Sequence, residues 1–233
     1  MNVAENKKRS FKEVLKSLDL KAKIKNFFYE IFAHPLHLIT HPIAGWDDFK
    51  REKKGKLWVA IFYLVMMIVT LIIVETCSGF IVNKNNPKDF DLLLTISLVI
   101  FPVIVGVAAN WCMTTLFDGK GNMKEIFMVI CYSFFPYVWL ALIGTIVSNF
   151  IIQDEAVYVT VLNTLGIVFV CYMMFMGLMV IHEFGLFQNL IMIIFTVVAI
   201  AIILFIMMLF LTLIQQVTGW ISAIYNELKM RYF

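Results

Sequence analysis

Five long apolar runs constrain this chain more than any other feature. They span residues 57–80, 92–117, 126–152, 157–181 and 186–214. Because about 20 helical residues cross the hydrocarbon core of a bilayer, each run can cross once and none can cross twice. Lipid cannot satisfy free backbone N–H and C=O groups, and the runs lack the dyad alternation of a membrane β-barrel. The sequence therefore predicts an all-α fold, an integral membrane bundle of five transmembrane helices.

The composition leaves little room for a soluble domain. Hydrophobic residues make up 61% of the chain and charged residues 15%, against about 45–50% and about 25% in ordinary soluble domains. We divide the chain into a cytoplasmic segment (1–56), a membrane domain (57–214) and a short amphipathic C-terminal tail (215–233). The first segment is too short for a separate globular domain of typical size, which excludes an independent soluble catalytic domain.

Basic residues are distributed unevenly and predict an orientation. Of the 19 Lys and Arg, 13 precede Leu57. The connections between the runs are short, so we expect neighbouring helices to form antiparallel hairpins. With the N-terminus in the cytoplasm, inside segments hold 15 basic residues and outside segments hold 4. The positive-inside rule then predicts a multi-pass protein with its N-terminus inside and its C-terminus outside.

Residues 11–32 have the pattern of a basic amphipathic helix. Apolar side chains recur there every three or four residues, with lysines between them. Such a helix can lie among the headgroups of an anionic leaflet. The alternative is a helix packed on a partner protein or on the inner ends of the spans. We predict that the basic residues of this segment bind anionic lipid, and we expect no nucleic acid as a partner.

Three histidines near the first run invite a metal hypothesis. His34, His37 and His41 stand three and four residues apart, but Pro35 and Pro42 are expected to break the helix that would align them. No Cys or carboxylate supplements them at ligand spacing. We interpret them as interfacial histidines in a turn-rich segment leading into the first span, and we predict no metal and no cofactor.

The motifs of enzymatic chemistry are missing from the sequence. It has no Walker-type loop, no HExxH, no GxSxG and no paired carboxylates within the apolar runs. His182 and Glu183 are adjacent, yet neighbouring helical residues point about 100° apart, so we interpret them as interfacial capping residues. The cysteines are interpreted as small buried hydrophobes; they are Cys77, Cys112, Cys131 and Cys171. We predict that the protein is not an enzyme.

Polar side chains inside the runs fall at helical spacing and form a candidate intramembrane cluster. Its members are Glu75, Asn110, Tyr132, Pro136, Thr145, Asn163 and His182. In the predicted topology Glu75, Thr145 and Asn163 share the outer half of the bilayer, while Asn110 and Tyr132 share the inner half. Glu75 is expected about 10 Å below the outer interface. Interhelical contacts are one interpretation of the cluster; a transport pathway is the other.

Two prolines, Pro102 and Pro136, sit in the middle of runs and predict kinks, because each removes a backbone hydrogen bond. Kinks permit splayed packing or a cavity. They are equally compatible with a carrier and with a scaffold.

Several short motifs resemble the Yip domain family, which is named for interaction with Ypt/Rab GTPases in eukaryotes. Residues 119–127 (GKGNMKEIF) run into residues 131–136 (CYSFFP). They resemble the family's Gly-containing cytoplasmic loop, followed in its third span by a Tyr with a Pro four residues later. Tyr132 and Pro136 match that pair. Residues 180–183 (VIHE) resemble the family's Val-x-His connection.

The resemblance implies the prokaryotic branch of that family, because the Asp-Leu-Tyr-Gly-Pro type element of the eukaryotic branch is absent before the first run. That branch implies a protein of the bacterial cytoplasmic membrane, in a group of which some members serve beside transport systems. The leading hypothesis is a non-enzymatic accessory or organising subunit of a transport-related membrane assembly. Its partners would be the lipid bilayer, anionic lipids and other membrane proteins such as transporter subunits. The alternative is a small-solute or lipid carrier that acts through the intramembrane polar cluster.

Overall fold

The computed structural model describes residues 25–83 and 90–232, and the secondary structure there is helical throughout. The elements are η1 (a π-helix, Tyr29–Ala33), α2 (His34–Thr40), α3 (Pro42–Arg51), α4 (Leu57–Cys77), α5 (Leu92–Leu116), α6 (Met123–Ser133), α7 (Phe135–Ser148), η3 (a 3₁₀-helix, Gln153–Glu155), α8 (Ala156–His182) and α9 (Leu186–Tyr232). Five helical segments are long and apolar enough to cross a membrane. The predicted all-α class and the five membrane-length helices are confirmed.

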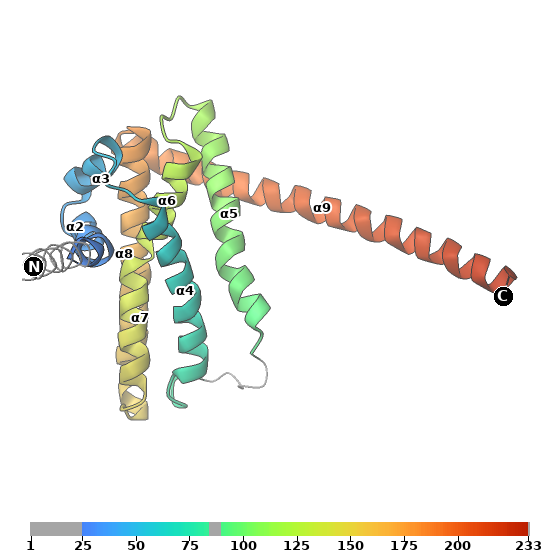
Figure 1. Cartoon of the computed structure of the whole chain (residues 1–233), viewed down its shortest axis with the longest axis horizontal. Coiled ribbons are helices and arrows are strands. Elements are labelled where there is room, and N and C mark those ends of the chain that lie inside the picture. The colour runs from blue at the N-terminus through green and yellow to red at the C-terminus, as the bar shows by residue number, and fades with distance from the viewer. Residues whose placement is uncertain (1–24, 84–89, 233) are drawn as a thin grey trace, which may run out of the picture.

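Helices α4, α5, α7 and α8 run along a common direction, and α3 lies across one end of this bundle (Figure 1). Helix α8 packs against α7 along one part of its length and against α6 and α3 along the rest. The hydrophobic core lies toward the α3 end. Its largest fully buried side chains include Trp46, Tyr63 and Tyr132, which come from α3, α4 and α6.

Helix α9 departs from the expected hairpin with α8. It leaves the bundle beside the end of α8 and runs outward at a wide angle to the other helices (Figure 1). Glu183 ends α8 in the left-handed conformation, with φ 57°, and Phe184 and Gly185 lead directly into α9. The antiparallel hairpin predicted for this pair is therefore wrong, because α9 packs on α5 instead of returning along α8.

The buried residues of α9 fall on one stripe near its start. They are Asn189, Met192, Thr196 and Ala199. Beyond this stripe the side chains are almost all exposed. The helix continues without a break through the predicted tail as far as Tyr232. At 1.5 Å per residue its length is about 70 Å, more than twice the hydrocarbon thickness.

The third apolar run is interrupted at the predicted place. Helix α6 ends at Ser133 and α7 begins at Phe135, with Pro136 in the first turn of α7, where a missing N–H costs little. A kink is predicted at Pro136, and the structure interrupts the helix one residue before α7 begins. Helix α5, in contrast, continues as one helix through Pro102.

The segment before α4 is helical, which corrects the expected turn-rich lead-in. The helix does not break at Pro35 because η1 widens into a π-helix just before it. Pro35 has no N–H for the carbonyl of Ile31, and the hydroxyl of Tyr63 donates to that oxygen instead. The helical segment breaks at His41, before Pro42, and again between Arg51 and Leu57. His34 is buried, against expectation, and stacks on Phe49.

The predicted amphipathic helix over residues 11–32 is described only from residue 25 onward. Residues 25–28 are helical and continue into η1. Phe28 is exposed there, but Phe27 stacks on Trp58 of α4 and Ile31 is buried in the core, so this part of the segment packs on the bundle, as the alternative interpretation expected. The remainder of that prediction lies outside the described residues.

Two expectations about depth and burial are wrong. Helix α4 ends at Cys77 rather than near Val82, so Glu75 lies two residues from the helix end and is exposed. The chain leaves α4 there because the segment after it packs closely on α7: the N–H of Gly79 donates to Oγ of Ser148, and a Cβ on Gly79 would lie 2.2 Å from the carbonyl oxygen of Ser148. Of the four cysteines only Cys131 is buried, and the other three point away from the bundle.

Candidate functional site at the basic end of the bundle

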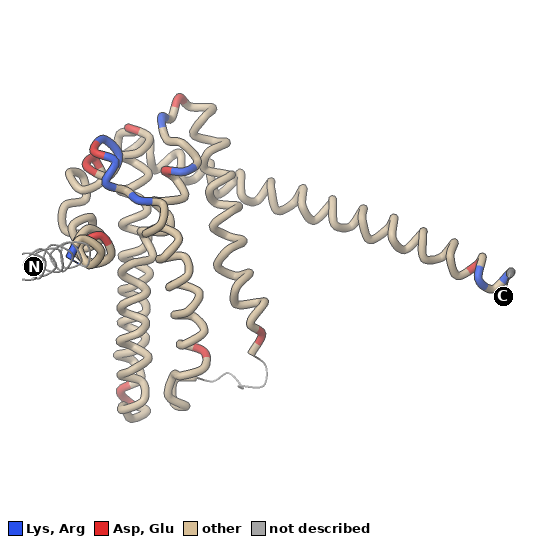
Figure 2. The backbone as a smooth tube through the Cα atoms, in the orientation of Figure 1, with Lys and Arg blue, Asp and Glu red and all other residues tan. Residues whose placement is uncertain are grey.

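Lys and Arg residues gather at the end of the bundle where α3 lies, which we call the basic end (Figure 2). Three elements meet there: α3, the loop between α5 and α6 (residues 117–122) and the C-terminus of α8. Polar groups of these elements, together with Asn110 of α5 and Thr196 of α9, form two adjacent sets of hydrogen bonds and ion pairs, which we call the polar junction. It is built from Lys50, Asn110, Lys120, Gly121, His182, Glu183 and Thr196.

The glycines of the loop explain how it packs so closely on α8. A Cβ on Gly119 would lie 2.9 Å from Nδ1 of His182 and 2.9 Å from the carbonyl oxygen of Thr114. A Cβ on Gly121 would lie 2.5 Å from Cγ2 of Ile181 and 2.7 Å from Cε1 of His182. The Gly-Lys-Gly sequence therefore allows the loop backbone to rest directly on the end of α8.

A chain of buried hydrogen bonds crosses the junction. The N–H of Gly121 donates to Nδ1 of His182 at 3.3 Å, which leaves Nε2 as the protonated nitrogen of a neutral ring. That Nε2 lies 3.1 Å from Oδ1 of Asn110. Nδ2 of Asn110 donates to Oγ1 of Thr196 at 3.2 Å, and Thr196 donates to the carbonyl oxygen of Met192. The chain thus ties the loop, α8, α5 and α9 together.

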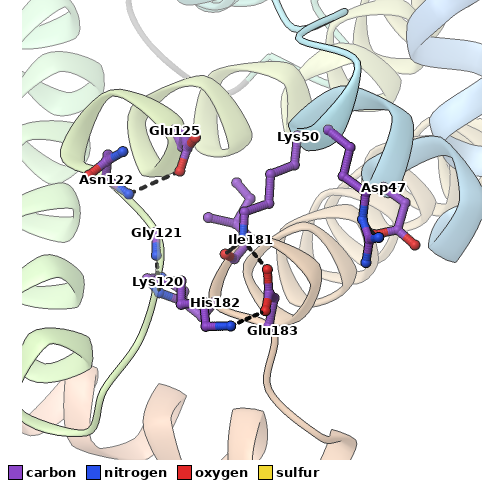
Figure 3. Close-up of polar contacts among 10 residues, drawn as sticks. Asp47, Lys50, Lys120, Gly121, Asn122, Glu125, Ile181, His182 and Glu183 are labelled. Atoms are coloured by element: carbon purple, nitrogen blue, oxygen red, sulfur yellow. Dashed lines mark hydrogen bonds and ion pairs between the residues drawn. The ribbon is translucent and has the colours of Figure 1, made fainter.

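Glu183 connects the same junction to α3. Its carboxylate accepts from Nζ of Lys120 at 2.6 Å and from Nζ of Lys50 at 2.9 Å, and Figure 3 shows both side chains reaching it. Lys50 also donates to the carbonyl oxygen of Ile181 at 2.7 Å, near the end of α8. Hydrogen bonds from Lys120 and Lys50 lower the pKa of Glu183 to about 2.

Tyr132 belongs to a neighbouring aromatic cluster rather than to the junction itself. Its ring meets those of His34, Phe49 and Tyr63. Its hydroxyl accepts from the backbone N–H of Lys56 at 3.1 Å and lies 3.3 Å from the carbonyl oxygen of the same residue. Tyr132 therefore fixes the start of α4 against α6.

His34 belongs to the same aromatic cluster, and its burial there is the main factor that lowers its pKa.

The other predicted site residues lie elsewhere in the bundle. Glu75 accepts a long hydrogen bond of 3.4 Å from Thr95 at the opposite end. Thr145 donates to the carbonyl oxygen of Ala141 in its own helix. Asn163, on α8, has a buried Oδ1 that finds no hydrogen-bond partner among residues 25–83 and 90–232. The structure brings Asn110 and His182 together, but the seven predicted residues do not form one cluster.

Sequence reasoning missed Lys50, Lys120 and Thr196 as junction residues. Thr196 had a usable signal, because it stands seven residues after Asn189 and so shares its helix face. The lysines had none, since their partner Glu183 is distant in sequence. In the part of the chain that the structure describes, no group of three or more His, Cys, Asp or Glu is placed to hold a metal ion.

The fold and the junction define a class, a multi-pass helical membrane protein whose polar side chains tie its helices together at one end. The family model described as Yip1 domain matches residues 36–224, most of the chain, and the chain belongs to that family. This confirms the resemblance drawn from the Gly-containing loop, Tyr132 and Pro136. Comparisons with curated proteins and with solved structures gave no match.

Proposed function

We propose that the protein is a non-enzymatic accessory or organising subunit of a membrane assembly, and that the assembly is transport-related. The observation that carries this proposal is α9. Only 17% of its most apolar part is buried within the chain, the lowest share among the five membrane-length segments. A helix that is apolar on all sides and packed on one short stripe has most of its surface available to lipid and to partner helices.

The polar side chains of α9 add to this argument. Thr212 and Thr218 donate to carbonyl oxygens one turn back in the same helix, and Gly219 has open space where a Cβ would lie. Small residues and hydroxyls of this kind are typical of helix–helix contacts in membranes, where they allow backbones to approach. The outer part of α9 is the segment best suited to bind another membrane protein.

A carrier is the second candidate, and Asn163 is the observation that favours it. Its Oδ1 is buried near Gly144, between α7 and α8, without a partner in the described part of the chain. Unpaired polar atoms at membrane depth mark solute paths in some proteins. The accessory role has more support, because Asn110, His182 and Thr196 use their polar groups in contacts between helices.

We further propose the bacterial cytoplasmic membrane as the location, with the basic end inside. Lys50, Lys53, Lys120 and Lys124 lie on that end or line the pocket beside it, which is the distribution that the positive-inside rule requires. The count of basic residues further supports a C-terminus on the outside.

Photo-crosslinking in cells tests the accessory role. A photoreactive amino acid replaces Phe205 or Leu209 on α9 and, as the matched control, Val65 on α4, all three being at least half exposed. We expect a discrete protein adduct from the α9 positions and none from position 65, with transporter subunits as the crosslinked proteins. Adducts with lipid alone at every position would overturn the proposal. Adducts only with proteins unrelated to transport would overturn its transport part.

A further inference from the structure

A pocket opens between α3 and the first turn of α6, beside the polar junction. Its volume is about 560 Å³, within the range of small-molecule sites. Its lining includes three lysines, Lys50, Lys53 and Lys124, one glutamate, Glu125, and the apolar side chains of Phe49 and Met128. The lining thus combines an apolar floor with three lysines and one glutamate.

The charges around this pocket are not balanced by the protein. Lys50 pairs with Glu183, and the nearby Lys54 pairs with Asp48 and Glu52. Lys53 and Lys124, in contrast, make no ion pair within the described residues. The one carboxylate in the lining, Glu125, accepts at 3.0 Å from the backbone N–H of Asn122 and caps α6. The two unpaired ammonium groups thus exceed the single negative charge of Glu125, and the pocket lining carries a net positive charge.

The backbone around the pocket is arranged in a way that favours an anion. Helix α6 begins at Met123, so its first N–H groups and the positive end of its dipole lie at the pocket wall. Lys53 has φ 51°, a left-handed conformation that is unfavourable for a lysine and is found often where ligands bind. A Cβ on Gly55 would lie 2.4 Å from the ring of Phe49. The segment between α3 and α4 therefore packs directly on Phe49, which lines the pocket.

We propose that this pocket binds a phosphate-bearing anion through Lys53, Lys124 and the first turn of α6. The chemistry is shared by the headgroup of an anionic phospholipid and by a soluble phosphate compound. Apolar side chains on the floor, Phe49, Met123 and Met128, favour the lipid as the source of the phosphate. The proposal is independent of the accessory role, because it concerns the α3–α6 pocket and not α9.

Native mass spectrometry of the full chain released from detergent micelles tests this inference. The probes are phosphatidylglycerol, phosphatidylcholine and inorganic phosphate, each added at the same concentration. We expect phosphatidylglycerol adducts to exceed phosphatidylcholine adducts several-fold. In the double variant Lys53→Ser, Lys124→Ser the two lipids should give nearly equal adducts. Lysine-dependent adducts of inorganic phosphate alone would support the site and assign it to a soluble compound.

Two control variants keep the test specific. Lys53→Arg with Lys124→Arg retains the charges and should retain the adducts. Lys229→Ser with Arg231→Ser removes the same charge from the far end of α9 and should leave binding unchanged. The inference is overturned if the serine variant at the pocket binds both anions as the unmodified chain does. It is also overturned if the α9 variant loses as much binding as the pocket variant.

Discussion

Gly121→Ala is expected to destabilise the protein strongly although the change adds one methyl group. The new Cβ would lie 2.5 Å from Cγ2 of Ile181 and 2.7 Å from Cε1 of His182, distances that force the loop to move. Overpacking of this kind costs about 1–3 kcal/mol. The movement also breaks the hydrogen bond from Gly121 to His182 and leaves a buried acceptor unpaired, at about 1–3 kcal/mol. We expect a total loss of about 2–4 kcal/mol, since relaxation of the loop offsets part of the strain.

Gly185→Ala is the matched control, because nothing lies within 4 Å of a Cβ at that position. Its carbonyl oxygen accepts the N–H of Asn189 at the start of α9. Glycine is preferred to alanine at such a position, so we expect a loss well under about 1 kcal/mol.

Unfolding in mixed detergent and dodecyl sulfate micelles measures both variants. Cys131 is fully buried and serves as the reporter once the exposed Cys77, Cys112 and Cys171 are replaced by serine. The fraction of Cys131 that reacts with a thiol reagent then follows unfolding. The steric argument is refuted if the two glycine variants differ by less than about 0.5 kcal/mol, the usual spread of surface substitutions.

Three further outcomes are expected. Asn110→Ala should cost about 1–3 kcal/mol in the same unfolding assay, because the Nε2–H of His182 then stays buried without an acceptor. The ion pairs of Glu183 stabilise fully above the ordinary carboxyl pKa of 4.5 and are lost as the pH falls toward about 2; stability of Glu183→Gln should therefore fall less over that range than stability of the unmodified chain. With an impermeant thiol reagent on intact cells, a cysteine at Asp154 should react and one at Lys120 should not; the reverse pattern would invert the proposed orientation.

The sequence predicts the membrane-length helices well because hydropathy is a local property. The predicted runs 57–80 and 92–117 differ from α4 and α5 by three residues or fewer at each end. The start of α5 is also locally encoded, since the Asp91 carboxylate accepts the N–H groups of Leu93 and Leu94. Such features need no knowledge of the rest of the fold.

Features that depend on distant contacts could not be predicted in the same way. Helix α4 ends early because Gly79 donates its N–H to Oγ of Ser148, on α7. The pairing of Asn110 with His182 joins residues 72 positions apart. Neither contact leaves a periodic pattern in one segment. The position of Glu75 near the end of α4 and the polar junction could therefore be recognised only in the folded structure.

Helix α9 makes its contacts with the bundle near the polar junction, and the part of α9 beyond Ala199 is almost entirely exposed. Helix α9 is held at its start, where Asn189 donates to the carbonyl oxygen of Phe175 and Thr196 accepts from Asn110. Each such contact within a membrane contributes only about 0.6–2 kcal/mol. Stacking of Phe117 on Phe195 adds one more contact in the same region. Beyond Ala199 the direction of α9 is set by the stiffness of the helix, so a partner helix that packs there has few contacts within the chain to displace.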